Sequence, residues 1–325
     1  MRPPAIFLLG PTAVGKTDLA VALAEILNTE IVSVDSALVY RQMDIGTAKP
    51  DAATLARAPH HLIDIRDPAE VYSAGDFRRD ALQVMQQLTD QGKVPLLAGG
   101  TSLYFQRLLA GETNLPPADP QIRAKLEAEL QVQGAPALHQ RLSQLDPESA
   151  ARIAPTDPQR LVRALELWQL TGKTRTQLWQ EQSTPSFPWR VLQLGLLPPQ
   201  RAWLHERINL RFDLMLQSGF VEEVEELRAR PDLHLGLPSM KSVGYRQVWQ
   251  YLDGQFDWDA MRAAGQAATR QLAKRQLTWM RGWEGLQSIE VTRPELIERV
   301  SDQVMRFCET EKESRMCSKI SSKSD

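Results

Sequence analysis

Short apolar runs and helical repeats of apolar residues follow one another along most of the chain. Residues 5–9 form an uninterrupted apolar run, and apolar positions then recur at helical spacing over residues 19–27. Similar runs at residues 30–34, 93–98 and 190–196 are typical of buried strands. Because helical segments separate these strands, the pattern predicts right-handed crossovers and an α/β fold with a parallel sheet flanked by helices.

The stretch of residues 116–188 differs in character from the sequence around it. It is rich in Gln, Leu, Ala and Arg, and its apolar positions repeat at helical spacing near 120–133, 136–145 and 158–170. We therefore predict an all-helical insertion domain within the sheet domain. The predicted organisation is a first part of the core at 1–115, the insertion at 116–188, completion of the core with C-terminal helices at 189–312, and a disordered tail at 313–325.

A phosphate-binding sequence joins the first predicted strand to the first predicted helix. Residues 10–17 match the pattern G-x-x-x-x-G-K-T. In such a loop the backbone N–H groups converge on an anion, and the helix N-terminus adds partial positive charge. Lys16 supplies a mobile charge, and the Thr17 hydroxyl is placed to ligate Mg²⁺. The predicted phosphate-binding residues are Gly10, Pro11, Thr12, Ala13, Val14, Gly15, Lys16 and Thr17.

Two further segments end at the same edge of the predicted sheet. Asp35 follows the second strand, and Thr101 follows Gly99 and Gly100 after the third. Ligands of parallel α/β sheets bind beyond the carboxyl ends of the strands, so we expect these residues to face the phosphate loop. The position of Asp35 leaves three roles open: a metal ligand, a general base or a helix cap. Thr101 either contacts a phosphate or serves as a turn residue. The third strand lacks the terminal Asp that holds metal in ATPases, which argues against a motor or a switch GTPase.

The composition restricts the class of protein. The chain has 325 residues, of which 42% are hydrophobic, and a formal net charge of −2. Such a length supports a sizeable core and more than one structural unit, and the charge argues against a globally basic nucleic-acid coat. The apolar run at the N-terminus is too short to span a membrane, so we expect a cytoplasmic protein with no membrane association.

Candidate metal-binding residues are sparse. Cys308 and Cys317 lie in the polar C-terminal region and cannot form a zinc ligand set, a usage typical of a reducing compartment. His60 and His61 are adjacent in what the pattern indicates is a loop, with no third ligand nearby. A structural role is the preferred interpretation for both histidines.

Two predicted helices carry cationic faces. A charged helix face is usually only solvated, but two such faces in a chain of net negative charge favour a polyanionic partner. The faces comprise Gln159, Arg160 and Arg163 in the first helix and Arg270, Lys274, Thr278 and Arg281 in the second.

Seven motifs in order make the chain resemble the tRNA dimethylallyltransferases, also called tRNA isopentenyltransferases. The resemblance covers roughly residues 4–285, and the zinc finger of the eukaryotic members has no counterpart, which indicates the bacterial type. The motifs occupy residues 10–17, 35–50, 60–64, 98–104, 157–166, 242–247 and 274–281.

The resemblance implies a reaction and roles for its residues. The family transfers a dimethylallyl group from its diphosphate to N6 of the adenosine on the 3′ side of the anticodon in tRNA. By this resemblance Asp35 acts as general base, and Thr101 hydrogen-bonds the oxygen that bridges carbon and phosphorus. The loop N–H groups, Lys16 and Mg²⁺ on Thr17 stabilise the departing diphosphate.

The resemblance also implies one diphosphate-binding arginine and an RNA path, with the insertion as a clamp on the anticodon stem. Arg207 and Arg211 both qualify, and Arg211 is preferred. Leu38 stands where many family members carry Gln. The implied tRNA-binding residues are Asp35, Ser36, Ala37, Leu38, Thr101, Arg123, Gln159, Arg160, Leu161, Val162, Arg163, Met240, Lys241, Ser242, Val243, Gly244, Tyr245, Ala273, Lys274, Arg275, Gln276, Leu277, Thr278, Trp279 and Met280.

Two alternatives explain part of the same sequence. A small-molecule or nucleotide kinase accounts for the phosphate loop and the sheet, but not for the helical insertion or the cationic faces. A non-catalytic RNA-binding protein accounts for those faces and makes Asp35 and Thr101 incidental. The expected partners of the transferase are the tRNA anticodon stem-loop and dimethylallyl diphosphate, with Mg²⁺ as cofactor and a monomer as the working form.

Overall fold

The computed structural model describes residues 2–110, 115–181 and 187–321, with side chains described through residue 309. The chain divides into two compact units. Unit 1 comprises Met1–Leu109 and Pro188–Asp325, and unit 2 comprises Ala110–Phe187.

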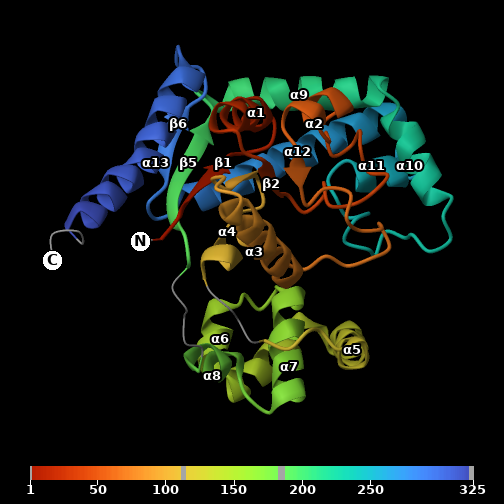
Figure 1. Cartoon of the computed structure of the whole chain (residues 1–325). Helices are drawn as coiled ribbons and strands as arrows, with labels where there is room; N and C mark the ends of the chain where they lie inside the picture. The colour runs from red at the N-terminus through yellow and green to blue at the C-terminus, as the bar shows by residue number, and fades with distance from the viewer. Residues whose placement is uncertain (1, 111–114, 182–186, 322–325) are drawn as a thin grey trace. The chain divides into compact units, whose positions relative to one another are not determined.

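Unit 1 is built on a parallel sheet, as the sequence predicted, and the sheet has six strands where four were expected. The strand order is β3-β2-β4-β1-β5-β6, so β1 lies between β4 and β5 at the centre of the sheet. Figure 1 shows β1 and β5 side by side. All five pairings are parallel, as expected for strands joined by helical crossovers. The strands are β1 (Pro4–Leu9), β2 (Ile31–Val34), β3 (His60–His61), β4 (Leu96–Gly99), β5 (Arg190–Leu197) and β6 (Gln287–Glu290).

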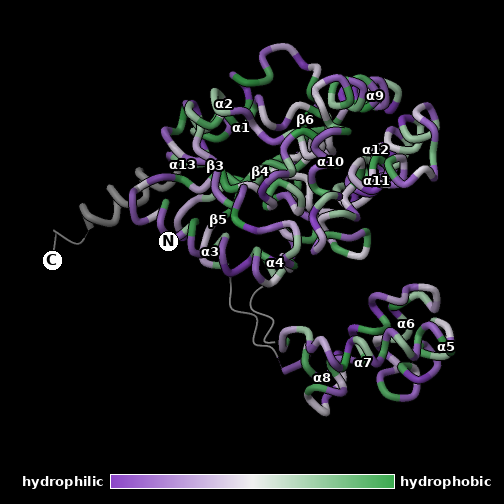
Figure 2. Tube along the Cα trace, turned by 90° about the vertical axis from the view of Figure 1, so that its right-hand side faces the viewer, coloured by the Kyte–Doolittle hydropathy of each residue, from purple (hydrophilic) through white to green (hydrophobic). Residues whose placement is uncertain are grey.

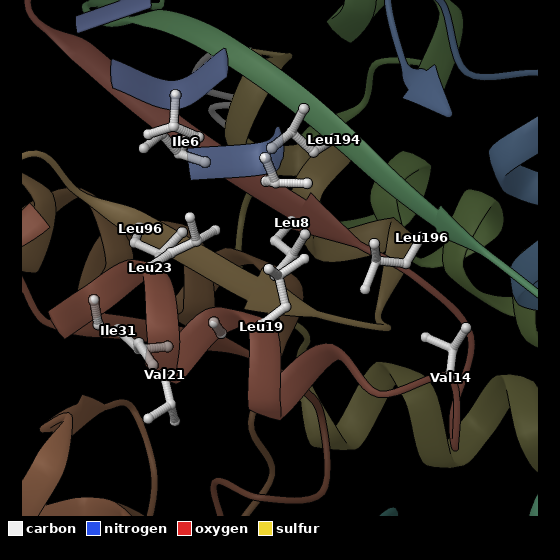
Figure 3. Close-up of a cluster of buried hydrophobic side chains, with 14 of the residues drawn as sticks. Ile6, Leu8, Val14, Leu19, Val21, Leu23, Ile31, Leu96, Leu194 and Leu196 are labelled. Carbon is white, nitrogen blue, oxygen red and sulfur yellow. The ribbon is translucent and has the colours of Figure 1, made fainter. Parts of the chain in front are cut away.

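The central strand β1 is buried on both faces, which explains its uninterrupted apolar sequence. Ile6 and Leu8 pack in one hydrophobic cluster with Leu23 of helix α1 (Lys16–Leu27), as Figure 3 shows. On the other face of the sheet, the ring centroid of Phe7 lies 5.1 Å from the ring centroid of Phe105 on α4 (Ser102–Leu109). In Figure 2 hydrophobic stretches accordingly gather around the central strands.

Histidines 60 and 61 form strand β3 beside β2, so their assignment to a loop was wrong. A two-residue strand is too short to produce an apolar run or an alternation. His60 Nδ1 lies 2.7 Å from the Ala58 carbonyl oxygen, and His61 Nε2 lies 2.6 Å from the Glu30 carboxylate. Burial lowers the pKa of His60. Over the described residues, no three His, Cys, Asp or Glu side chains gather as metal ligands.

Helices cover the sheet and extend unit 1 beyond it. Besides α1 and α4 they are α2 (Ala52–Arg57), α3 (Ala74–Asp90), α9 (Arg201–Gln217), α10 (Phe220–Arg228), α11 (Tyr245–Leu252), α12 (Trp258–Arg281) and α13 (Leu296–Ser321). Helices α9 and α12 pack closely because Gly265 faces the Phe212 ring, where a Cβ atom would lie 2.1 Å from Cζ. None of the described helices is long and apolar enough to cross a membrane.

The backbone of α13 continues to Ser321, into the segment 313–325. Disorder of that segment stays a prediction. The segment lacks apolar periodicity, yet it contains Glu, Lys, Arg and Met, which have high helix propensity. Propensity therefore extends a helix whose first turns pack through Val300 and Val304.

Unit 2 is all-helical over its described residues. Its core contains Leu126, Leu138 and Leu165, in agreement with the predicted helical repeats. The two repeats near 120–133 and 136–145 form one helix, α5, which has a kink at Gly134. Gly134 adopts a φ of 79° and lies two residues before Pro136. The helices are α5 (Pro120–Leu145), α6 (Pro147–Arg152), α7 (Pro158–Thr171) and α8 (Arg175–Gln180).

Candidate active site

The phosphate loop joins β1 to α1 as predicted, at the carboxyl edge of the sheet. Gly15 adopts φ 97°, a conformation that favours glycine, and no side chain caps this end of α1 in the described structure. The first N–H groups of the helix are therefore free to bind an anion. Lys16 Nζ donates to the Pro11 carbonyl at 2.7 Å. Burial lowers the pKa of Lys16 to about 8, an effect that Asp35 opposes.

Asp35 follows β2 and is held by the turn after it. Its Oδ1 accepts the Ala37 N–H at 2.8 Å and the Leu38 N–H at 3.4 Å. These bonds fix the carboxylate at the end of the strand, where the sequence predicted it. Among the three roles left open, the capping role is excluded because residues 36–39 form no helix.

Thr101 lies beside the Asp35 turn. Its hydroxyl accepts the Ser36 N–H at 3.2 Å. The two glycines before Thr101 lie close to other parts of the protein. A Cβ atom on Gly99 would lie 2.0 Å from the Val34 carbonyl oxygen of β2, and one on Gly100 would lie 2.4 Å from the Gln276 amide nitrogen. Both glycines therefore permit a close approach of other parts of the protein.

The two candidate arginines of α9 make different contacts with the phosphate loop. Arg211 donates to the Thr12 hydroxyl, and it lines the adjacent cavity. Burial lowers the pKa of Arg211, while Asp35 opposes the shift. Arg207 donates to the Ala13 carbonyl at 2.9 Å, and its guanidinium lies 4.9 Å from the Trp203 ring centroid. The geometry therefore favours Arg211 as the guanidinium that faces a ligand.

One cavity of about 500 Å³ brings these groups together. Its polar wall contains Thr12, Asp35, Thr101 and Arg211 from four separate segments. Its apolar wall comprises Ile208, Phe212, Met215, Val243, Leu272 and Trp279. The arrangement offers an apolar group a place beside an anion-binding loop and a carboxylate.

The structure brings only part of the implied RNA-binding set to this cavity. The set members that line it are Asp35, Ser36, Ala37, Thr101, Lys241, Ser242, Val243, Tyr245, Arg275, Gln276 and Trp279. Lys274 and Thr278 lie exposed elsewhere on α12, while Leu38 and Leu277 are partly buried.

Several residues of the implied set are buried, and their assignment as RNA contacts stays a prediction. Leu161 and Val162 pack in the core of unit 2. Met240, Ala273 and Met280 are likewise buried in unit 1. Gly244, also buried, precedes α11 with φ 94°. The buried side chains among them pack within the elements that carry the exposed members.

Two arginines of unit 2 that were assigned to RNA bind a buried carboxylate. Glu166 is fully buried and accepts from Arg123 at 3.1 Å and from Arg163 at 2.8 Å. Arg163 also donates to the Pro116 carbonyl. A buried carboxylate requires such partners, so these arginines have a structural role. Gln159 and Arg160 are exposed on α7, the helix of Arg163, and Arg160 forms an ion pair with the Asp157 carboxylate at 3.4 Å.

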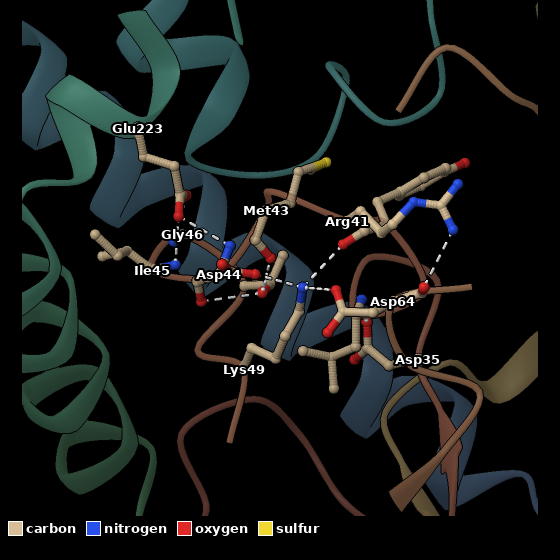
Figure 4. A network of polar contacts seen from close by, with 12 residues as sticks. Asp35, Arg41, Met43, Asp44, Ile45, Gly46, Lys49, Asp64 and Glu223 are labelled. Carbon is tan, nitrogen blue, oxygen red and sulfur yellow. Dashed lines mark hydrogen bonds and ion pairs between the residues drawn. The ribbon is translucent and has the colours of Figure 1, made fainter. Parts of the chain in front are cut away.

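Glu223 is a residue that the sequence analysis missed. Its carboxylate accepts the N–H groups of Asp44 at 2.9 Å, Ile45 at 2.7 Å and Gly46 at 3.1 Å (Figure 4). It also accepts the Tyr245 hydroxyl at 2.6 Å. Burial raises the pKa of Tyr245, and the Glu223 charge adds to the effect, so this hydroxyl remains protonated and donates.

The Glu223 network shapes the cavity. Gly46 and Tyr245, both bound to the carboxylate, line it, as does Thr47. Position 46 requires glycine, because a Cβ atom there would lie 2.1 Å from the Phe220 ring and 2.6 Å from that of Tyr245. No local signal identifies Glu223, which is one of four glutamates between residues 222 and 226.

The fold and site define a class: a P-loop α/β protein with an anion-binding loop, a carboxylate and an apolar cavity at one sheet edge. The family model "IPP transferase" matches residues 38–283, most of the chain. The chain belongs to this family.

Named relatives agree with the family model. A tRNA dimethylallyltransferase of Chromohalobacter salexigens is 56% identical over 289 residues, covering 89% of this chain and 93% of the relative. The crystal structure of the full-length tRNA isopentenylpyrophosphate transferase of Bacillus halodurans has a TM-score of 0.70 and 34% identity, covering 97% of this chain and all of that one. A eukaryotic dimethylallyltransferase captured acting on tRNA has a TM-score of 0.77 and 25% identity, covering 89% of this chain and 74% of that one.

Proposed function

We propose that this protein transfers a dimethylallyl group from dimethylallyl diphosphate to N6 of the adenosine on the 3′ side of the anticodon in tRNA. The products are N6-(dimethylallyl)adenosine and diphosphate. The observation that carries the proposal is the cavity that unites Thr12, Asp35, Thr101 and Arg211 beside an apolar wall. The family and the names of the relatives support the same reaction.

Asp35 is the proposed general base. The adenine amino group is a weak nucleophile because its lone pair is delocalised into the ring. A bond forms between N6 and the first carbon of the dimethylallyl group while the bond from that carbon to the diphosphate oxygen breaks. The N6 proton passes to the Asp35 carboxylate, which two backbone N–H groups hold in place.

The phosphate loop and its neighbours receive the leaving group. Lys16, Arg211 and the N-terminus of α1 provide positive charge for the departing diphosphate. Thr101 donates a hydrogen bond to the oxygen that bridges carbon and phosphorus. The loop thus stabilises an anion as it leaves, and no phosphoryl group is transferred. A kinase would use the same loop differently, and the family match does not favour it.

Thr17 suits one position in a Mg²⁺ site. Thr17 is exposed in the first turn of α1, next to Lys16. Mg²⁺ commonly binds through one or two protein groups, with phosphate oxygens and water as its other ligands. Such an ion would neutralise charge on the diphosphate.

We assign the RNA surface to the exposed part of the implied set. Arg275 and Trp279 on α12 line the cavity, as does Lys241 before α11, and Lys274 lies exposed elsewhere on α12. In unit 2, Arg160 serves the proposed clamp. The target adenine leaves its stack in the RNA to reach Asp35, at a cost of about a few kcal/mol. We take a cytoplasmic monomer as the working form of the protein.

The test is transfer by an Asp35→Ala variant. Removal of the base should slow transfer at least ~100-fold while tRNA and diphosphate still bind, and Asp90→Ala, on the surface of α3, should transfer normally. Filter binding and rates with labelled donor measure the two properties. Near-normal transfer by Asp35→Ala would remove this carboxylate from the mechanism.

A further inference from the structure

Gln276 connects two walls of the candidate active site through one side chain. This residue of α12 is half-buried and lines the cavity. Its Oε1 accepts the Thr12 N–H at 2.9 Å, and its Nε2 donates to the Gly100 carbonyl at 3.0 Å. One bond reaches the phosphate loop after β1, and the other reaches the residue that precedes Thr101 after β4.

The local geometry is built around this amide. A Cβ atom on Gly100 would lie 2.4 Å from the Gln276 nitrogen, so an alanine at that position would displace the side chain. Thr12 is held from a second direction, because its hydroxyl accepts from Arg211. The same loop residue therefore connects α12 and α9.

The chemistry of the two contacts selects glutamine. Thr12 N–H requires an acceptor and the Gly100 carbonyl requires a donor, and an amide provides both groups on one rigid plane. A glutamate could accept from Thr12 but would place a negative charge against the Gly100 carbonyl and near the phosphate loop. An alanine would leave both backbone groups without their partner.

We propose that Gln276 is a positioning residue for the transfer reaction, rather than a contact to RNA. The inference rests on the proposed function. Gln276 fixes the separation between Thr12 in the phosphate loop and Thr101, which act on the same departing diphosphate. Charge on the bridging oxygen and on the diphosphate develops together in the transition state, so both groups must be in place at once. Displacements of about 1 Å can reduce a rate by about 100-fold.

The role predicts a particular kinetic pattern. Gln276→Ala should lower kcat by about 10- to 100-fold at saturating tRNA, because the lost geometry matters most in the transition state. The Kd for tRNA should change less than about 3-fold, since the amide is turned toward the loop. Gln276→Glu should also raise the KM for the donor, because a carboxylate would stand near the diphosphate.

The experiment compares Gln276→Ala and Gln276→Glu with the wild type and with Gln271→Ala, an exposed neighbour on the same helix. Steady-state transfer of labelled dimethylallyl at saturating tRNA and varied donor concentration gives kcat and the KM for the donor, and filter binding gives the Kd for tRNA. Each rate is divided by the concentration of folded protein, which the thermal melting curve of that variant gives at the assay temperature. A normal kcat with a weaker Kd would show that Gln276 contacts RNA and would overturn the inference, as would normal values for both.

The wild-type arm separates this inference from the proposed function. If the wild type transfers no label to tRNA, the proposed reaction itself is wrong. If the wild type is active and Gln276→Ala retains full kcat, the reaction stands and the positioning role fails.

Discussion

Removal of the Glu223 carboxylate tests how strongly the cavity wall depends on one acidic side chain. The carboxylate accepts three backbone N–H groups and the Tyr245 hydroxyl at 2.6–3.1 Å. A hydrogen bond to a charged group contributes about 1.5–3 kcal/mol, and the four bonds share one partly exposed acceptor, so their energies do not add in full. We expect Glu223→Ala to lower the free energy of unfolding by about 3–5 kcal/mol.

Thermal unfolding measures this effect. With about 2–4 °C per kcal/mol for a large domain, the Tm of the transition that reports unit 1 should fall on the order of 10 °C. Tyr245→Phe removes one of the four bonds and should cost about 1 kcal/mol. Glu226→Ala, exposed on the same helix, is the control and should melt like the wild type. A Tm for Glu223→Ala within about 1 °C of the wild type would refute the reasoning.

Three further predictions follow from the charges and packing. The Lys16 ammonium is charged below its pKa of about 8, so kcat/KM for the donor should be level over the neutral range just below that pKa and fall as the pH rises above it. Lys274→Ala and Arg160→Ala should each weaken tRNA binding and reduce its salt dependence by about one charge. Gly99→Ala should cost at least ~1–3 kcal/mol of stability in urea unfolding, because its Cβ would meet the β2 backbone, whereas Gly75→Ala should be tolerated.

Each of these predictions has a contradicting outcome. A donor kcat/KM that stays level to pH 10 would show that the Lys16 charge is not needed for donor capture. Unchanged salt slopes for both cationic variants would remove the two faces from the RNA surface. Equal urea midpoints for the Gly99 and Gly75 variants would contradict the close approach of β2 and β4.

The sheet was largely predictable from the sequence because its central strands are buried on both faces. Burial of this kind produces continuous apolar runs, as in β1. The edge strands gave no such signal. β3 has two residues, and β6 (Gln287–Glu290) is mostly exposed and polar. Helix α13 extends to Ser321 over a segment that has helix propensity but no apolar periodicity, a pattern that resembles a solvated tail.

The site was predictable where topology alone decides position. The phosphate loop, Asp35 and Thr101 each follow a parallel strand, so they had to meet at one edge. Glu223 and the inward direction of Gln276 depend on contacts between residues far apart in sequence, which no local pattern records. Burial of Leu161 was visible in its apolar repeat, but the family resemblance assigned the whole motif to RNA.

The central claim is tested most directly by incubating the protein and Mg²⁺ with labelled dimethylallyl diphosphate and unmodified tRNA, followed by mapping of the label. A parallel reaction contains labelled ATP in place of the prenyl donor. We predict label on the adenosine next to the anticodon and none transferred from ATP. An unlabelled RNA, together with phosphate released from ATP, would contradict the account and support a kinase.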